Sequence, residues 1–264
     1  MHIWGYLAAS LIGLSLGLIG GGGSILTIPV LVYLFDINPV EATGYSLFIV
    51  GLTSLSGAIK NYLSGLVDVK TACLFSGIAS ITVLLIRRYV LHVIPEQLFS
   101  VGEIHVTKSL MIMVVFAVLM LSAALKMILA PMPSDPPGTI YHVKPFSLIS
   151  TAMGIGCVTG FLGAGGGFLI IPALIFTFHL EVKKAIATSL LIIALNALIG
   201  FLGDLSHIQY DWTLLISVSA VAISGMFAGI ALNKKIDSTR LKKGFGFFVI
   251  IMAIYVLLKE ILGL

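Results

Sequence analysis

Charged residues are scarce in this chain of 264 residues: Asp, Glu, Lys and Arg together make up 10%, whereas hydrophobic residues make up 59%. A typical soluble domain is about 25% charged and about 45–50% apolar. A soluble protein of this length could not hide so much apolar surface, because much of any folded surface remains exposed to solvent. The composition, with a mean hydropathy of +1.14, therefore predicts an integral membrane protein.

Cysteine is also rare, and the basic residues do not form a polar face. Cys73 and Cys157 both lie in apolar stretches, which argues against a disulfide framework and indicates small buried side chains. The net charge of +4 does not indicate a nucleic-acid partner, because most Lys and Arg lie in short segments between apolar blocks, as orientation in a membrane requires. The N-terminus lacks a basic region and an A-x-A site, so we expect a first membrane segment rather than a cleaved signal.

The sequence lacks the signatures of common enzymes. It contains no HExxH and no GxSxG, and the run GGGGS lacks the GK[ST] ending of a phosphate loop. The histidines have no His or Cys at i+3 or i+4, and the i+4 pairs His92–Glu96 and His207–Asp211 are weak metal signals. We therefore expect no catalytic site, no metal and no cofactor, and a protein that moves a substrate across a membrane.

Apolar blocks long enough to be membrane helices recur along the chain. They cover residues 3–35, 41–63, 69–91, 107–130, 146–179, 184–205, 212–232 and 244–262. Residues 131–145 contain five prolines and form the one long polar, helix-breaking stretch. The sequence thus predicts an all-α polytopic bundle with a first membrane repeat at 1–130, a proline-rich linker at 131–145 and a second repeat at 146–264.

The two halves resemble each other. GLIGGGGSILTIP ends at Pro29 and GFLGAGGGFLIIP ends at Pro172, an offset of 143 residues. The same offset pairs Ser46 with Ser189, and Asp68 with Asp211. Matching glycines, prolines and aspartates are unlikely to arise by chance in an apolar sequence, so we expect an internal duplication like those of secondary transporters.

The first block of each half is interrupted by glycines. Residues 3–35 would form a straight helix of about 50 Å, longer than the about 30 Å of a bilayer core, but Gly20–Gly23 break it, and Gly165–Gly167 break the later block. We expect a broken helix or a re-entrant hairpin. If each block crosses once, ten Lys and Arg share one side and five the other. Hairpins would instead invert the halves; the basic loops 88–108 and 232–243 favour the parallel arrangement.

The glycine breaks are the leading candidate for a binding site. Half-helices that begin after a break point free N–H groups and a positive dipole end into the protein, which suits an anion, and Ser24 and Thr27 can add hydroxyl donors. The alternative is that the glycines only permit close helix packing. The candidate substrate-binding residues are Gly20, Gly21, Gly22, Gly23, Ser24, Thr27, Ser46, Lys60, Asn61, Gly163, Gly165, Gly166, Gly167, Ser189, Asn196 and Asp204.

Polar residues near the ends of later blocks are open to two interpretations. Lys60 can attract the anion, with Asp204, its neighbour in repeat register, holding Lys60 while the site is empty. Alternatively both side chains reach the membrane interface, and Asn196 joins helices. We expect Asp68 and Asp211 to be helix N-caps.

The doubled glycine break followed by proline, together with Gly65-Leu66-Val67-Asp68 and Asp211-Trp212, resembles the sulfite exporter TauE/SafE family over roughly residues 5–262. The resemblance implies a small multi-pass permease for sulfite, sulfonates or other small organic anions. Ala164 stands in the second break where Gly21 stands in the first, so the two breaks need not bind equally.

These observations predict a secondary transporter of small anions in the cell membrane, first of all sulfite or organosulfonates. A carboxylate carrier or channel is the alternative, and a membrane-embedded enzyme or an accessory subunit fits less well. The expected partners are the anionic substrate, the lipid bilayer, a coupling ion (proton or sodium) and further copies of the chain in a homo-oligomer.

Overall fold

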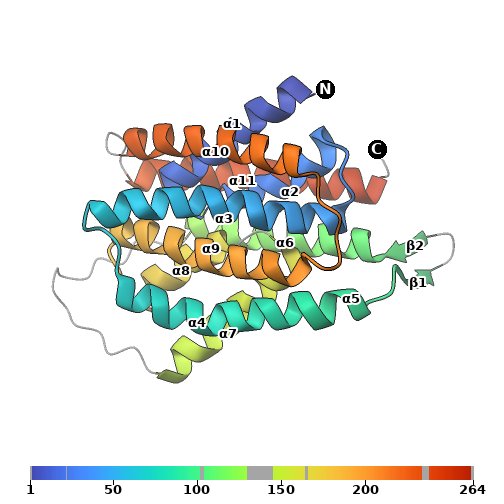
Figure 1. The fold of residues 1–264 in the computed structure, drawn as a ribbon, viewed down its shortest axis with the longest axis horizontal. Coiled ribbons are helices and arrows are strands. Elements are labelled where there is room, and N and C mark those ends of the chain that lie inside the picture. Colours follow the sequence, from blue (N-terminus) through green and yellow to red (C-terminus); the bar gives the residue numbers. More distant parts are fainter. Residues whose placement is uncertain are drawn as a thin grey trace.

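The computed structural model describes residues 2–21, 23–101, 104–129, 145–163, 166–233 and 238–262, and over these it is a helix bundle (Figure 1). The fold class predicted from the sequence is confirmed; the one β element in this part is a short antiparallel hairpin. The elements are α1 (His2–Ile19), α2 (Ser24–Leu34), α3 (Pro39–Leu63), α4 (Val69–Leu85), the π-helical turn η1 (Ile86–Val90), α5 (Leu91–Val93), β1 (Gln97–Val101), β2 (Ile104–Thr107), α6 (Lys108–Leu129), α7 (Pro145–Leu162), α8 (Gly167–Phe176), α9 (Val182–Asp204), α10 (Trp212–Asn233) and α11 (Ser238–Leu262).

Several helices have the dimensions of membrane spans. In the described part of the chain, four stretches are long and apolar enough to cross a bilayer: α3, α4 with η1 (Val69–Val90), α9 and α10. The N-terminal ends of two of them are capped as the sequence predicts. Asp68 accepts a hydrogen bond from the Thr71 N–H (3.1 Å), and Asp211 accepts one from the Thr213 N–H (2.9 Å).

Each glycine-broken block folds into a hairpin of two short helices. Tyr6 near the start of α1 packs edge-on against Phe35, just after α2, with ring centroids 5.9 Å apart, so α2 returns toward the end where α1 begins. In the second half α8 packs back on α7, and Ala152 of α7 shares a hydrophobic cluster with Leu174 of α8. Of the two forms that the sequence allows, a single broken helix or a hairpin, the hairpin is therefore the observed one.

The two halves have opposite orientations in the bundle. Along α3, Gly44 lies against Asp204 and Gly57 lies against Leu190, so α3 and its counterpart α9 are antiparallel. The packing partners also correspond: α1 packs on α10 as α7 packs on α4, and α3 packs on α10 as α9 packs on α4. The parallel arrangement favoured by the sequence analysis is wrong, because an odd number of chain reversals precedes the second half once each broken block turns back. The duplication itself stays a prediction.

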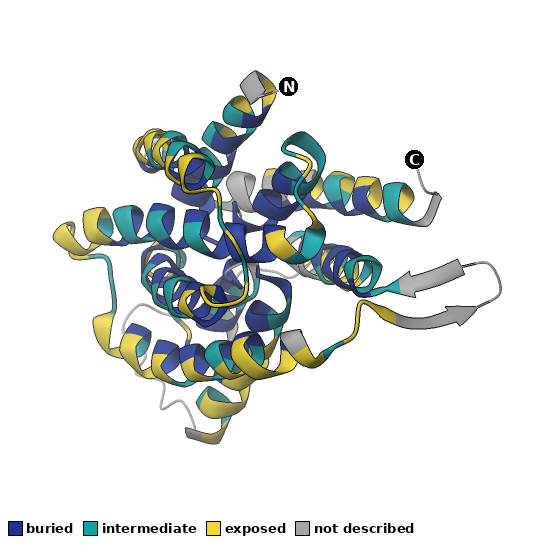
Figure 2. Ribbon diagram, turned by 45° about the vertical axis from the view of Figure 1, so that its right-hand side comes forward, coloured by how far each residue is buried: buried dark blue, intermediate teal, exposed yellow. Residues whose placement is uncertain are grey.

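Apolar side chains cover the outside of the bundle as well as filling its core. Figure 2 shows buried residues along the inner faces of the helices and exposed ones on the outside. Among the exposed side chains are Leu63, Ile81 and Ile251, each more than half exposed. Cys73 and Cys157 are exposed too, so the expectation of buried cysteines is wrong. An apolar outer surface of this kind suits contact with lipid.

Candidate functional site

The two glycine breaks meet inside the bundle. Gly21 packs directly on Gly167, leaving no room for a side chain on either residue, and Gly167 also contacts Ile193 of α9. Gly20 packs against Ser189, and all of these glycines are buried. Because α2 begins at Ser24 and α8 begins at Gly167, two positive helix ends come close together in the protein interior.

The backbone at the breaks takes conformations that favour glycine. Gly20 has φ of 81° and Gly163 has φ of 68°, in the left-handed region that side chains with a Cβ rarely adopt. The chain can therefore end one helix and begin the next within a few residues. Both halves need this turn, which is why the glycine pattern occurs twice.

Hydroxyl groups surround the breaks, and several are bonded to backbone carbonyls. Ser24 Oγ donates to the Gly21 carbonyl (2.7 Å), Thr27 Oγ1 to the Gly23 carbonyl (3.4 Å) and Ser189 Oγ to the Ile186 carbonyl (2.8 Å). These protons are thus used in this conformation. By contrast, Ser46 Oγ and Thr159 Oγ1 are buried without a hydrogen-bond partner among the described residues, and Thr159 lies against Gly166.

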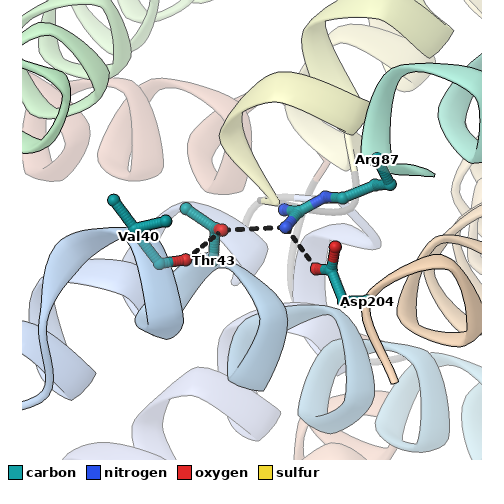
Figure 3. A network of polar contacts seen from close by, with 4 residues as sticks. All are labelled: Val40, Thr43, Arg87 and Asp204. Atoms are coloured by element: carbon teal, nitrogen blue, oxygen red, sulfur yellow. Dashed lines mark hydrogen bonds and ion pairs between the residues drawn. The ribbon is translucent and has the colours of Figure 1, made fainter. Parts of the chain in front are cut away.

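A buried ion pair lies beside the second break. Arg87 Nη1 is 2.5 Å from Asp204 Oδ2, and it also donates to Thr43 Oγ1 at 2.9 Å (Figure 3). The Thr43 hydroxyl in turn donates to the Val40 carbonyl at 2.6 Å. Both charged side chains are 0% exposed. The guanidinium also packs against Gly163, where a Cβ would collide with Nη2.

The π-helical turn explains how Arg87 comes to lie inside the bundle. The chain carries Arg87 and Arg88 in succession, and the turn Ile86–Val90 leaves Arg87 buried and Arg88 exposed. An inserted π turn changes the facing of the residues that follow it, and such turns frequently mark functional sites. The neighbouring Gly203 of α9 allows close approach, since its Cβ position lies 3.1 Å from Arg87 Cβ.

A tyrosine completes this cluster from the loop between α9 and α10. Tyr210 Oη and Asp204 Oδ2 both lie next to Gly44, with Oδ2 3.2 Å from the Cβ position of that glycine. The Tyr210 ring packs against Tyr45 and Phe201, with centroids 5.0 and 4.9 Å away. Burial, and secondarily the charge of Asp204, raises the pKa of Tyr210, so its hydroxyl stays protonated.

Comparison with known proteins gives the family of this chain. The family described as Sulfite exporter TauE/SafE matches residues 6–256. The chain belongs to the sulfite exporter TauE/SafE family. A "Probable membrane transporter protein" of Xylella fastidiosa (strain Temecula1) is 30% identical over 260 residues, covering 96% of this chain and 94% of that protein. The "Probable membrane transporter protein YunE" of Bacillus subtilis is 30% identical over 235 residues, covering 84% of each chain. No solved structure matches the chain significantly.

The structure places most of the candidate site residues that were predicted from the sequence of this TauE/SafE-family membrane transport protein. The structure brings together Gly20, Gly21, Gly167 and Ser189, and it places Gly166 beside Thr159. Ser46 is buried on α3, three residues from Thr43, whereas Gly22 and Gly165 lie outside the described residues. What these residues bind stays a prediction.

The pairing of Lys60 with Asp204 is wrong. Asp204 is paired with Arg87, and Lys60 is exposed near the opposite end of α3. Since Gly44 lies against Asp204, the helical rise puts Lys60 about 24 Å away along α3. Residues in repeat register lie at opposite ends because the halves are inverted; Asn61, the counterpart of Asp204, is only half-buried.

The sequence leaves open a structural alternative for Asn196, which is to join helices, and for Asp204, which is to reach the membrane interface. Asn196 is buried and accepts a hydrogen bond from Ser80 of α4 (2.7 Å), a helix-joining contact of the kind offered as its alternative. Asp204 is 0% exposed and is paired with Arg87. Sequence reasoning used Arg87 only for orientation and missed it as a site residue. An arginine within an apolar segment was the available signal.

Proposed function

We propose that this protein is a secondary transporter that moves small anions across the cell membrane without changing them chemically, with sulfite and organosulfonates as the first substrates to test. The observation that carries the proposal is the guanidinium of Arg87, fully buried and packed against Gly163 of the second glycine break. An anion that reaches this break meets a permanent positive charge and the start of a half-helix.

The chemistry of the cluster favours an oxyanion. A guanidinium presents several N–H donors in one plane and binds planar or tetrahedral oxyanions through paired hydrogen bonds. The interior has a low effective dielectric constant, so attraction to Arg87 is stronger there than in water. The N-terminal ends of α2 and α8 add partial positive charge to that of Arg87.

The arrangement of the halves suits alternating access. Secondary transporters built from inverted halves bind substrates where interrupted helices meet near the middle of the membrane. Here the hairpins α1–α2 and α7–α8 meet through Gly21 and Gly167 between the antiparallel helices α3 and α9. Rocking of one half against the other would open the breaks to each side in turn. We expect this multi-pass protein to act in the lipid bilayer with a coupling ion, and assembly into a homo-oligomer would fit the fold.

Counterflow in liposomes tests the proposal with the wild-type protein. Vesicles preloaded with unlabelled sulfite should accumulate labelled sulfite transiently, which a carrier does and a channel does not. Parallel vesicles loaded with methanesulfonate, acetate or succinate rank sulfur oxyanions against carboxylates. Preference for succinate or acetate would favour the carboxylate carrier, and equilibration without counterflow would favour the channel. No movement of any of these anions would contradict the proposed function.

A further inference from the structure

The charge balance around Arg87 constrains what can bind there. In the described structure its guanidinium is neutralised by the Asp204 carboxylate, 2.5 Å away and equally buried. An anion arriving at Gly163 would share one cation with a second negative charge. Buried charge without a partner is costly, and a buried carboxylate that loses its cation is more easily neutralised by a proton than left ionised.

We propose that Asp204 is the proton carrier of transport: the anion takes over the guanidinium of Arg87 while Asp204 takes up one proton, so that anion and proton cross together. This inference rests on the proposed function, since it concerns the same site. The empty site holds a guanidinium and a carboxylate; the loaded site holds a guanidinium, the anion and a neutral carboxylic acid. The net charge is zero in both states for a monoanion.

The surroundings of Asp204 allow this exchange. The residue ends α9, and its backbone carbonyl accepts a hydrogen bond from the N–H of His207 (2.9 Å) in the exposed loop that follows. Leu205, Ser206 and His207 are exposed, so the buried carboxylate lies within one to three residues of the protein surface. Tyr210 from the same loop stays protonated beside Asp204 and offers a neutral donor to the carboxylate.

The contribution of Asp204 to the pH dependence has to be distinguished from that of the other titratable groups at this end of the bundle. Glu41 and Tyr45 lie on α3, Arg88 on η1, His207 and Tyr210 in the loop, and Asp211 at the start of α10. The α7 segment Pro145–Leu162 brings no acidic or basic side chain. Glu41 and His207 are exposed and serve as controls, because removing them should leave a coupling that depends on Asp204 intact.

At the opposite end of the bundle, the described residues in repeat register with this cluster do not form such a pair. In repeat register Arg87 corresponds to Ile230, Thr43 to Ile186 and Asp204 to Asn61. Ile230 is buried, and Asn61 cannot take up a proton in this way. Among these counterparts only Asp204 can take up a proton, so the proposal expects a single proton to accompany each anion.

The test measures anion affinity against pH for the purified protein in detergent, with sulfite and methanesulfonate as probes. Wild-type affinity should fall about tenfold per pH unit over the range in which Asp204 is ionised in the empty protein. Asp204→Asn should remove this dependence, while Glu41→Gln and His207→Gln should keep it. A wild-type slope in Asp204→Asn would overturn the proposal.

Proton counting supplies a measurement that needs no variant. Binding of methanesulfonate, which carries no proton of its own near neutrality, should take up close to one proton per anion from a weakly buffered solution. If only sulfite binds, the measured proton uptake is corrected for the protons that free sulfite already carries. Binding without proton uptake contradicts this inference alone. Failure of both probes, and of acetate and succinate, to bind contradicts the proposed function, and this inference falls with it.

Discussion

Gly21 and Gly167 pack backbone against backbone where the two hairpins meet, and neither position can accommodate a Cβ without displacing the other. The contact joins residues that are far apart in sequence and belong to opposite halves. It brings the starts of α2 and α8 together. Movement of one half against the other must therefore change the surroundings of both breaks.

Substitution at the breaks should strongly weaken anion binding while the protein still inserts into the membrane. At Gly166, φ is 65° and Thr159 lies directly beside the Cβ position, so Gly166→Val forces the backbone to move. We expect affinity for sulfite to fall at least tenfold, about 1.4 kcal/mol or more. Gly77→Ala is the matched control, because nothing lies within 4 Å of its Cβ position. Unchanged affinity in Gly166→Val would show that the break does not hold the anion.

The inverted arrangement makes a labelling prediction. Val93 ends α5, just after α4 and η1, and Leu232 lies in the last turn of α10; both are exposed and lie near the ends of corresponding helical segments of the two halves. Single cysteines at these positions, in a background lacking Cys73 and Cys157, should be labelled from opposite sides of the membrane. Labelling of both from one side would restore the parallel arrangement and contradict the packing of α3 on α9.

Lys60 should matter little for the anion. Its side chain is exposed near the end of α3 remote from Arg87 and Asp204. We expect Lys60→Gln to change sulfite affinity by less than about twofold, since a solvated or snorkelling ammonium contributes little at that distance. A tenfold loss would revive the prediction made from the sequence, in which Lys60 faces the substrate.

Much of the fold could be predicted from local sequence. The main correction concerns the relative orientation of the two halves, which are inverted and not parallel. Glycine and proline positions predict the breaks, and Asp68 and Asp211 predict helix starts, because these effects depend on residues a few positions apart. Whether a broken block crosses or turns back depends on packing between distant segments. That single choice decides whether Lys60 or Arg87 is the partner of Asp204.

The site contains a second feature that the sequence alone could not predict. Arg87 and Arg88 are chemically identical neighbours, yet in the π turn Arg87 is buried and Arg88 is exposed. A π turn is set by the tertiary contacts of the helix and has no reliable sequence pattern. The glycines at Gly20 and Gly163 could be predicted as special, but their neighbours Ser189 and Arg87 could not.

The most direct test of the central claim is the affinity for labelled sulfite of a charge-balanced double variant, Arg87→Gln with Asp204→Asn. Removing both charges avoids leaving either one buried alone, which would destabilise the fold. The matched control is Arg88→Gln with Glu41→Gln, a pair of exposed charges at the same end. We predict that the buried pair loses at least tenfold in affinity, about 1.4 kcal/mol or more, and that the exposed pair binds like the wild type. Wild-type affinity in the Arg87→Gln/Asp204→Asn protein would contradict the account, because the anion would then be held without the buried arginine.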